Sequence, residues 1–148
     1  MKKFLVLCLM VLFVGGCGSK DNLTNIDISQ ASVKLDEKYT NMVDMDDKEL
    51  SIVYGLDVSL LEEYEIKSSQ LMNGNFYAIL KVSDKNMDTV RDQMDNLFSV
   101  LESQSNLYSP DAVKLIKNHL ETEVGNYLIY IVSEDNNAMY EIIKGYIS

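Results

Sequence analysis

The sequence predicts an α+β domain with a small three-stranded sheet, which a β-hairpin and a third strand form and several helices cover. Residues 64–69 and 75–82 have strand-like patterns and flank Asn73-Gly74, a dipeptide that favours a tight hairpin turn because both residues tolerate positive φ. Residues 84–101 repeat apolar side chains at helical spacing, and residues 127–133 are apolar on both faces. These observations predict the element order α-α-β-β-α-α-β-α.

Two helices are expected before the hairpin. The first covers residues 29–39, with Ser29 as its N-terminal cap. The second covers residues 46–54, because Asp46 can cap it and Glu49 follows at the spacing of a capping box.

The first hairpin strand alternates in polarity, with Tyr64 and Ile66 on one face and Glu65 and Lys67 on the other. This half-exposed pattern favours a place at the edge of the sheet. We therefore expect the strand order 1-2-3, with the order 2-1-3 as the alternative.

Three helices are expected after the hairpin. The longest begins at Asp84 and buries an apolar stripe of Met87, Val90, Met94, Leu97, Phe98 and Leu101. Ser109-Pro110 begins the next helix, with proline at its first position and a stripe of Val113, Ile116 and Leu120. Gly125-Asn126 then turns the chain into the third strand, and the last helix covers residues 135–147.

The N-terminal segment has the layout of a secretory signal. Lys2 and Lys3 precede an uncharged apolar run from Phe4 to Val14, which Gly15-Gly16 and Cys17 follow. The run is about half of the roughly 20 residues that a membrane span needs. A cysteine directly after small residues is typical of a bacterial lipoprotein signal. We predict a diacylglyceryl thioether on Cys17, whose two acyl chains, such as palmitate, suffice for stable anchoring.

This signal predicts the domain organisation and the location. Residues 1–16 are expected to be a cleaved lipoprotein signal peptide, residues 17–26 a flexible lipidated tether and residues 27–148 a single α+β domain. The protein is expected at the cell membrane, lipid-anchored on the extracytoplasmic side.

Composition excludes several classes of function. Without Lys2 and Lys3 the mature chain has 11 basic and 23 acidic residues, a net charge of −12, which argues against binding nucleic acid or anionic lipid. Cleavage removes Cys8, and the lipid occupies the sulfur of Cys17. We therefore expect no disulfide, no thiol nucleophile and no cysteine metal site, and no feature of the chain predicts a cofactor.

From about Leu50 to its C-terminus, the chain resembles a family of uncharacterised lipoproteins of Gram-positive bacteria, classed as a domain of unknown function. The resemblance implies a similar fold and location, and it assigns no activity. It rests on the order and spacing of these segments: Tyr54-Gly55-Leu56-Asp57, Leu61-Glu62-Glu63-Tyr64, Tyr77-Ala78-Ile79, Leu101-Glu102-Ser103-Gln104, Tyr108-Ser109-Pro110 and Gly125-Asn126-Tyr127.

An acidic cluster and a single histidine are the polar candidates for a site. Asp44, Asp46, Asp47 and Glu49 form the densest acidic cluster, but it lacks the central glycine and the closing glutamate of a calcium loop, and helix capping accounts for most of it. We predict no metal site there. His119 has no nucleophile motif to serve, and we expect it to be a surface histidine near a helix C-terminus, so no catalytic residue is assigned.

The tyrosines are the remaining candidates. Tyr77 and Tyr130 lie on predicted strands, where an exposed aromatic face would bind a ligand, with core packing as the alternative. The leading hypothesis is a non-enzymatic, membrane-anchored domain that binds an envelope protein or a small ligand. The alternatives are an envelope enzyme or accessory factor acting on peptide or cell-wall substrates, with His119 in its site, and a purely structural surface protein.

Overall fold

The computed structural model describes residues 24–70 and 74–148, which form a five-stranded antiparallel sheet in the order β1-β2-β3-β5-β4. Both edge strands are short, and β3 and β5 lie inside the sheet. The strands are β1 (Met42–Asp44), β2 (Leu61–Ser69), β3 (Phe76–Val82), β4 (Leu120–Val124) and β5 (Tyr127–Val132).

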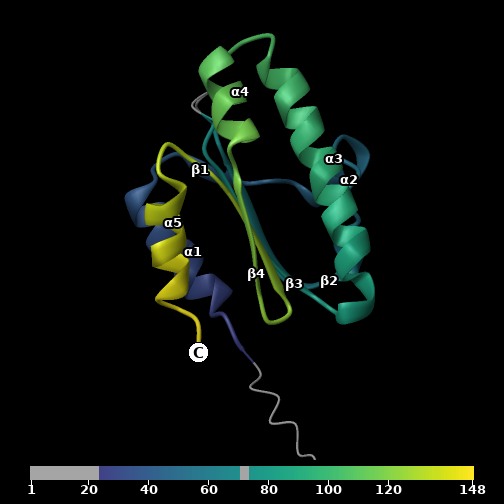
Figure 1. The fold of residues 1–148 in the computed structure, drawn as a ribbon, viewed down its shortest axis with the longest axis vertical. Coiled ribbons are helices and arrows are strands. Elements are labelled where there is room, and N and C mark those ends of the chain that lie inside the picture. The colour runs from purple at the N-terminus through teal and green to yellow at the C-terminus, as the bar shows by residue number, and fades with distance from the viewer. Residues whose placement is uncertain (1–23, 71–73) are drawn as a thin grey trace, which may run out of the picture.

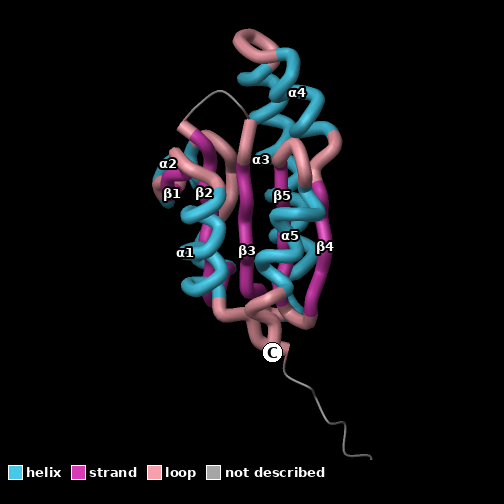
Figure 2. Tube along the Cα trace, turned by 90° about the vertical axis from the view of Figure 1, so that its left-hand side faces the viewer, coloured by secondary structure: helices cyan, strands magenta, loops and turns pink. Residues whose placement is uncertain are grey.

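Helices cover both faces of the sheet and make a three-layer domain (Figure 1). One face packs against α1 (Ile28–Lys38) and α5 (Asn136–Lys144). The other packs against α2 (Asp47–Ile52), α3 (Met87–Ser105) and α4 (Pro110–Lys117). Figure 2 shows α4 rising beyond one end of the sheet, opposite the end where the C-terminus lies.

The two inner strands supply a separate core to each face. Along β3, Tyr77 and Ile79 are buried against α1 and α5, whereas Phe76, Ala78 and Leu80 are buried against α3 and its neighbours. All six residues of β5 are buried as well. Strands covered on both faces are apolar throughout, which explains the continuous apolar run of β5.

The predicted three-stranded sheet is wrong, because the sheet has five strands. Strands β1 and β4 are not among the predicted elements, so the predicted element order is wrong too. The sequence predicts Leu120 in a helix stripe, but α4 ends at Lys117 and Leu120 begins β4. As an edge strand with half-exposed Leu120, Thr122 and Val124, β4 has too little apolar surface to stand out in the sequence.

The prediction that the first hairpin strand lies at the edge of the sheet is also wrong. That strand is β2, and it lies inside the sheet because β1 pairs with its end from Lys67 to Ser69. The three predicted strands, β2, β3 and β5, are nevertheless neighbours in that order. All neighbouring strands pair antiparallel.

Helix caps explain most of the helix starts. Asp46 accepts hydrogen bonds from the amides of Lys48 and Glu49, as its capping role predicts. Ser109 caps α4, with Pro110 at the first helical position. The first helix is capped by Asp27 and not by Ser29, which lies inside it.

The two ends of the folded domain lie side by side. Asn25 exchanges backbone hydrogen bonds with Ser148, and Ile26 forms a bridge with Ile147. Ile26 is buried, so the last residues of the segment predicted as a tether are part of the folded domain. The predicted signal peptide and Cys17 lie outside the described residues.

In the described part of the chain, none of the helices combines the length and the apolar character that a membrane crossing requires.

Candidate functional site

The structure places Tyr77 and Tyr130, the predicted ligand-binding residues, in the core. Both side chains are almost fully buried, and they point to opposite faces of the sheet. The hydroxyl of Tyr77 lies 3.0 Å from that of Ser32 in α1, and Tyr130 donates to Glu121 Oε1 at 3.4 Å. The two tyrosines therefore cannot form one exposed aromatic surface.

Burial changes the acidity of both phenols. Removal from water disfavours the charged phenolate, so burial raises the pKa of Tyr77 and of Tyr130 above the usual value. The negative charge of Asp36 acts in the same direction on Tyr77, and that of Glu121 does so on Tyr130. The folded state therefore holds both phenols in their neutral form.

Alkaline pH should consequently destabilise the domain. The folded pKa of Tyr77 lies above the unfolded value of about 10, so its contribution to stability is complete below pH 10 and is lost as the pH rises through the folded pKa. The denaturation midpoint of the wild type should fall between pH 9 and pH 11. The midpoint of Tyr77→Phe should fall less steeply over this range. The midpoint of Tyr108→Phe, a control at an exposed position, should change with pH as the wild type does. Identical pH profiles for all three proteins would contradict this assignment.

His119 is half-buried in an aromatic cluster. Its ring stacks on Phe98 with centroids 4.1 Å apart, and its Nδ1 lies 2.8 Å from the carbonyl oxygen of Ile116. The Phe98 ring also packs edge-on against Phe76, with ring centroids 5.4 Å apart, and lies beside Tyr130, with ring centroids 5.6 Å apart. His119 follows the C-terminus of α4, as the sequence predicts. Its ring, however, packs against the core and is not freely exposed to solvent.

The acidic residues near α2 have separate partners. Asp46 caps α2, Asp47 accepts a hydrogen bond from Tyr64 at 2.7 Å, and Asp44 lies 3.4 Å from Lys67. The bond to Asp47 raises the pKa of Tyr64 to about 12. Among residues 24–70 and 74–148, no group of three or more histidine, cysteine or carboxylate side chains could hold a metal ion.

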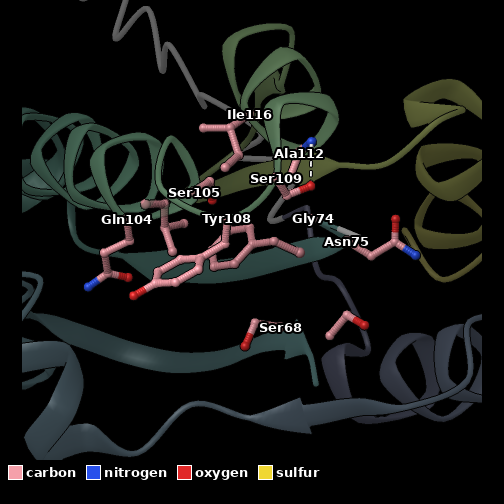
Figure 3. A pocket seen from close by; sticks show the side chains of 12 residues that line it. Ser68, Gly74, Asn75, Gln104, Ser105, Tyr108, Ser109, Ala112 and Ile116 are labelled. Carbon is pink, nitrogen blue, oxygen red and sulfur yellow. Dashed lines mark hydrogen bonds between the residues drawn. The ribbon is translucent and has the colours of Figure 1, made fainter. Parts of the chain in front are cut away.

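A cavity of about 350 Å³ lies at the end of the sheet where α4 lies. We call it the end cavity. It opens between the C-terminal turn of α3, α4 and the turn end of the β2–β3 hairpin, and Figure 3 shows its side chains. Its lining residues are Ser68, Ser69, Gly74, Asn75, Phe76, Leu101, Gln104, Ser105, Tyr108, Ser109, Ala112 and Ile116.

Local structure fixes the walls of the end cavity. The hydroxyl of Ser109 accepts a hydrogen bond from the amide of Ala112, which orients the first turn of α4 (Figure 3). Gly74 has a φ of +78°, and a Cβ there would lie 3.1 Å from the Cβ of Ala112. Glycine therefore lets the hairpin approach α4 closely. Gln104 is held at the rim by Tyr54, whose hydroxyl donates to Oε1 at 3.3 Å.

The lining of the end cavity combines an apolar floor with an uncharged polar rim. Phe76, Ala112 and Ile116 are buried, whereas Tyr108 is 70% exposed at the mouth. Among the described residues that line it, none carries an ionisable carboxylate, imidazole or amine. Such a surface can hold an apolar group and hydrogen-bond to it, but it offers no side chain suited to acid–base catalysis near neutral pH.

A second hollow of about 360 Å³ lies near the same end of the domain. It is lined by Tyr39, Asn75, Ser133, Glu134 and Asp135. Asp135 is already engaged as the cap of α5, through a hydrogen bond from the amide of Ala138. With few lining residues and little apolar surface, this hollow is the weaker candidate.

The end cavity was not predicted from the sequence. From Gln104 to Ser109 the chain leaves the regular stripe of α3, and the folded structure leaves Leu107 and Tyr108 75% and 70% exposed beside polar, uncharged residues. The segment has neither charges nor catalytic residue types, so its sequence resembles an ordinary polar connection between two helices.

Comparison with known families places the chain in one of them. A family model described as a domain of unknown function (DUF4358) matches residues 35–133. The chain belongs to this family. The DUF4358 match begins within α1 and ends just after β5, so it contains all five strands and every lining residue of the end cavity.

The family membership agrees with the resemblance to an uncharacterised family, and it assigns no activity. No curated protein and no solved structure matches the chain. The function of this DUF4358 domain therefore has to be argued from its own residues.

Proposed function

We propose that this DUF4358 protein is a lipid-anchored, extracytoplasmic lipoprotein of a Gram-positive bacterium and that its folded domain is a non-enzymatic binding module. The anchor is supported by the N-terminal sequence, in which a basic start, a short apolar run and Gly15-Gly16 precede Cys17. Binding is supported by the end cavity.

One observation carries the binding proposal: the end cavity is concave, apolar at its floor and free of charged side chains in its described lining. Its volume of about 350 Å³ lies near the lower end of the range of small-molecule sites, roughly 300–1,000 Å³. A hollow of this kind favours a small ligand that is held by desolvation and a few hydrogen bonds.

The enzyme alternative has weaker support. A catalytic histidine needs a free ring face or edge toward the substrate and an orienting acid. His119 stacks on Phe98, points Nδ1 at a backbone carbonyl and is not among the residues that line the end cavity. We therefore prefer binding over catalysis.

The anchor makes a direct prediction. Cys17→Ala should leave the precursor uncut, because the acylated sulfur is the feature that lipoprotein processing needs, and inhibition of the lipoprotein signal peptidase should do the same to the wild type. Mass spectrometry of the N-terminal peptide measures both the cleavage site and the acyl mass. A mature protein that begins elsewhere, or that carries no acyl group, would contradict the proposal.

The cavity makes a second prediction, which uses the uncharged dye Nile red as a probe. The protein without its lipidated cysteine, from Gly18 to Ser148, should bind the dye saturably, with increased fluorescence. Ser105→Trp should weaken binding at least tenfold, because the indole would fill the end cavity that Ser105 lines. Ser103→Trp is the matched control, since Ser103 is exposed on the same helix and outside the lining. Equal binding by both variants would refute the cavity as the site.

A further inference from the structure

We infer that the end cavity takes an uncharged ligand with an apolar body, and that the ligand arrives from the side of the domain that faces away from the membrane. This inference rests on the proposed function, because it names the ligand class of the same site and uses the proposed anchor at Cys17.

The chemistry of the lining determines the ligand class. The floor of Phe76, Ala112 and Ile116 is buried and offers only apolar contacts. The rim offers hydroxyl groups from Ser68 and Ser105 and the carboxamide of Gln104. These groups can donate to or accept from an amide, an ester or a hydroxyl, so a ligand with such a group on an apolar body satisfies both parts of the site.

Charge works against the alternatives. A charged group that is taken out of water without a partner loses more solvation than a few neutral hydrogen bonds return. The described lining has no lysine, arginine or histidine for an anion and no carboxylate for a cation. The mature chain also carries a net charge of −12, which repels anions before they reach the mouth.

The position of the cavity indicates the direction of approach. The described chain starts at the opposite end, which we call the base: Gly125 lies against Thr24, and the amide of Val82 donates to the carbonyl of Asn126. Helix α3 begins soon after Val82, near the base. Its 19 residues extend about 28 Å away from the base to the end cavity.

The anchor holds the base and not the cavity near the membrane. From Cys17 to Thr24, the first residue that the structure describes, the chain covers seven residue steps, which reach at most about 25 Å. The acidic surface is repelled by anionic lipid headgroups, which disfavours a domain that lies flat with its cavity against the bilayer. A ligand in water or in the cell wall therefore meets the cavity more readily than a lipid that stays in the bilayer.

The first experiment tests the ligand class with three probes that share one apolar body. 4-Phenylbutanamide is uncharged, 4-phenylbutyrate is an anion and 4-phenylbutylamine is a cation. Binding to the protein without its lipidated cysteine, from Gly18 to Ser148, is measured by NMR titration, with Ser105→Trp as the blocked control and Ser103→Trp as the open one. The amide should bind at least tenfold more tightly than either charged probe, and Ser105→Trp should abolish the difference.

The second experiment tests the direction of approach in the lipidated protein on vesicles of phosphatidylcholine and phosphatidylglycerol. Leu107→Cys places a dye beside the mouth, and Ser148→Cys places one at the base, where the C-terminus lies (Figure 2). Each cysteine is the single free thiol, because Cys8 leaves with the signal peptide and the lipid occupies Cys17. Energy transfer to a dye-labelled lipid should be at least twofold stronger from position 148 than from position 107.

The outcomes separate this inference from the proposed function. If no probe binds and Nile red does not bind either, the binding function itself fails. If the carboxylate or the amine binds as tightly as the amide, or if position 107 transfers energy as strongly as position 148, the site binds ligands but the inference made here is wrong.

Discussion

Leu97→Ala should reduce the free energy of unfolding by about 2–5 kcal/mol, which is a large share of the stability of a domain of this size. Leu97 is fully buried in α3 and belongs to the core between α3 and the sheet. Truncation removes apolar contacts and leaves a cavity that the surrounding core residues cannot close without moving.

The control for this variant lies on the other side of the same helix. Asp92 is exposed, so Asp92→Ala should change the free energy of unfolding by about 0.5 kcal/mol or less. Urea denaturation followed by circular dichroism measures both variants. If the two midpoints moved by the same amount, α3 would not present Leu97 to the core.

Lys67→Met should cause the second largest loss of unfolding free energy, about 2–3 kcal/mol, because it leaves partly buried carboxylates without their cation. The Lys67 side chain is only 11% exposed, and its ammonium lies 2.6 Å from Asp36 and 3.2 Å from Glu65. Burial alone would lower the pKa of Lys67, but the hydrogen bonds from its ammonium to these carboxylates more than offset that effect and raise it. Methionine keeps most of the apolar stem and removes the charge, so the carboxylates would repel one another.

The expected loss is smaller than for a fully buried ion pair, because the side chains of Asp36 and Asp44 are 38% and 79% exposed and water screens them. Added salt should therefore restore part of the stability of Lys67→Met. Lys34→Met, which breaks an exposed pair with Glu37, should leave the denaturation midpoint unchanged. A Lys67→Met midpoint equal to that of the wild type would mean that this cluster contributes no stability.

The sequence was most informative where one physical signal dominated. The apolar stripe of α3, the caps at Asp46 and Ser109 and the two-sided apolar run of β5 each match the structure, because periodicity and capping are local properties. Strand pairing is not local. β1 has three residues and β4 mixes glutamates with half-exposed apolar residues, so neither is recognisable before its partner strand is known.

The site was harder to predict than the fold. The prediction for Tyr77 and Tyr130 rests on residue type, yet the depth of a tyrosine depends on which helices cover its strand. The end cavity arises where the α3–α4 pair meets the β2–β3 hairpin, which is distant from it in sequence, and its polar residues are serines and amides that are common in loops. Only the tertiary arrangement distinguishes them from ordinary loop residues.

Because β1 is short, part of the outer edge of β2 is left open to other molecules. Because β1 pairs only with the end of β2, no strand covers the outer edge of β2 from Leu61 to Glu65 in the part of the chain that the structure describes. An uncovered edge invites a neighbouring molecule to add a strand. Here the ladder is interrupted by a bulge between Leu61 and Glu63, and Glu62 and Glu63 are exposed. Two copies that met along this edge would bring their glutamates together, so the bulge and the charges disfavour strand pairing through this edge of β2.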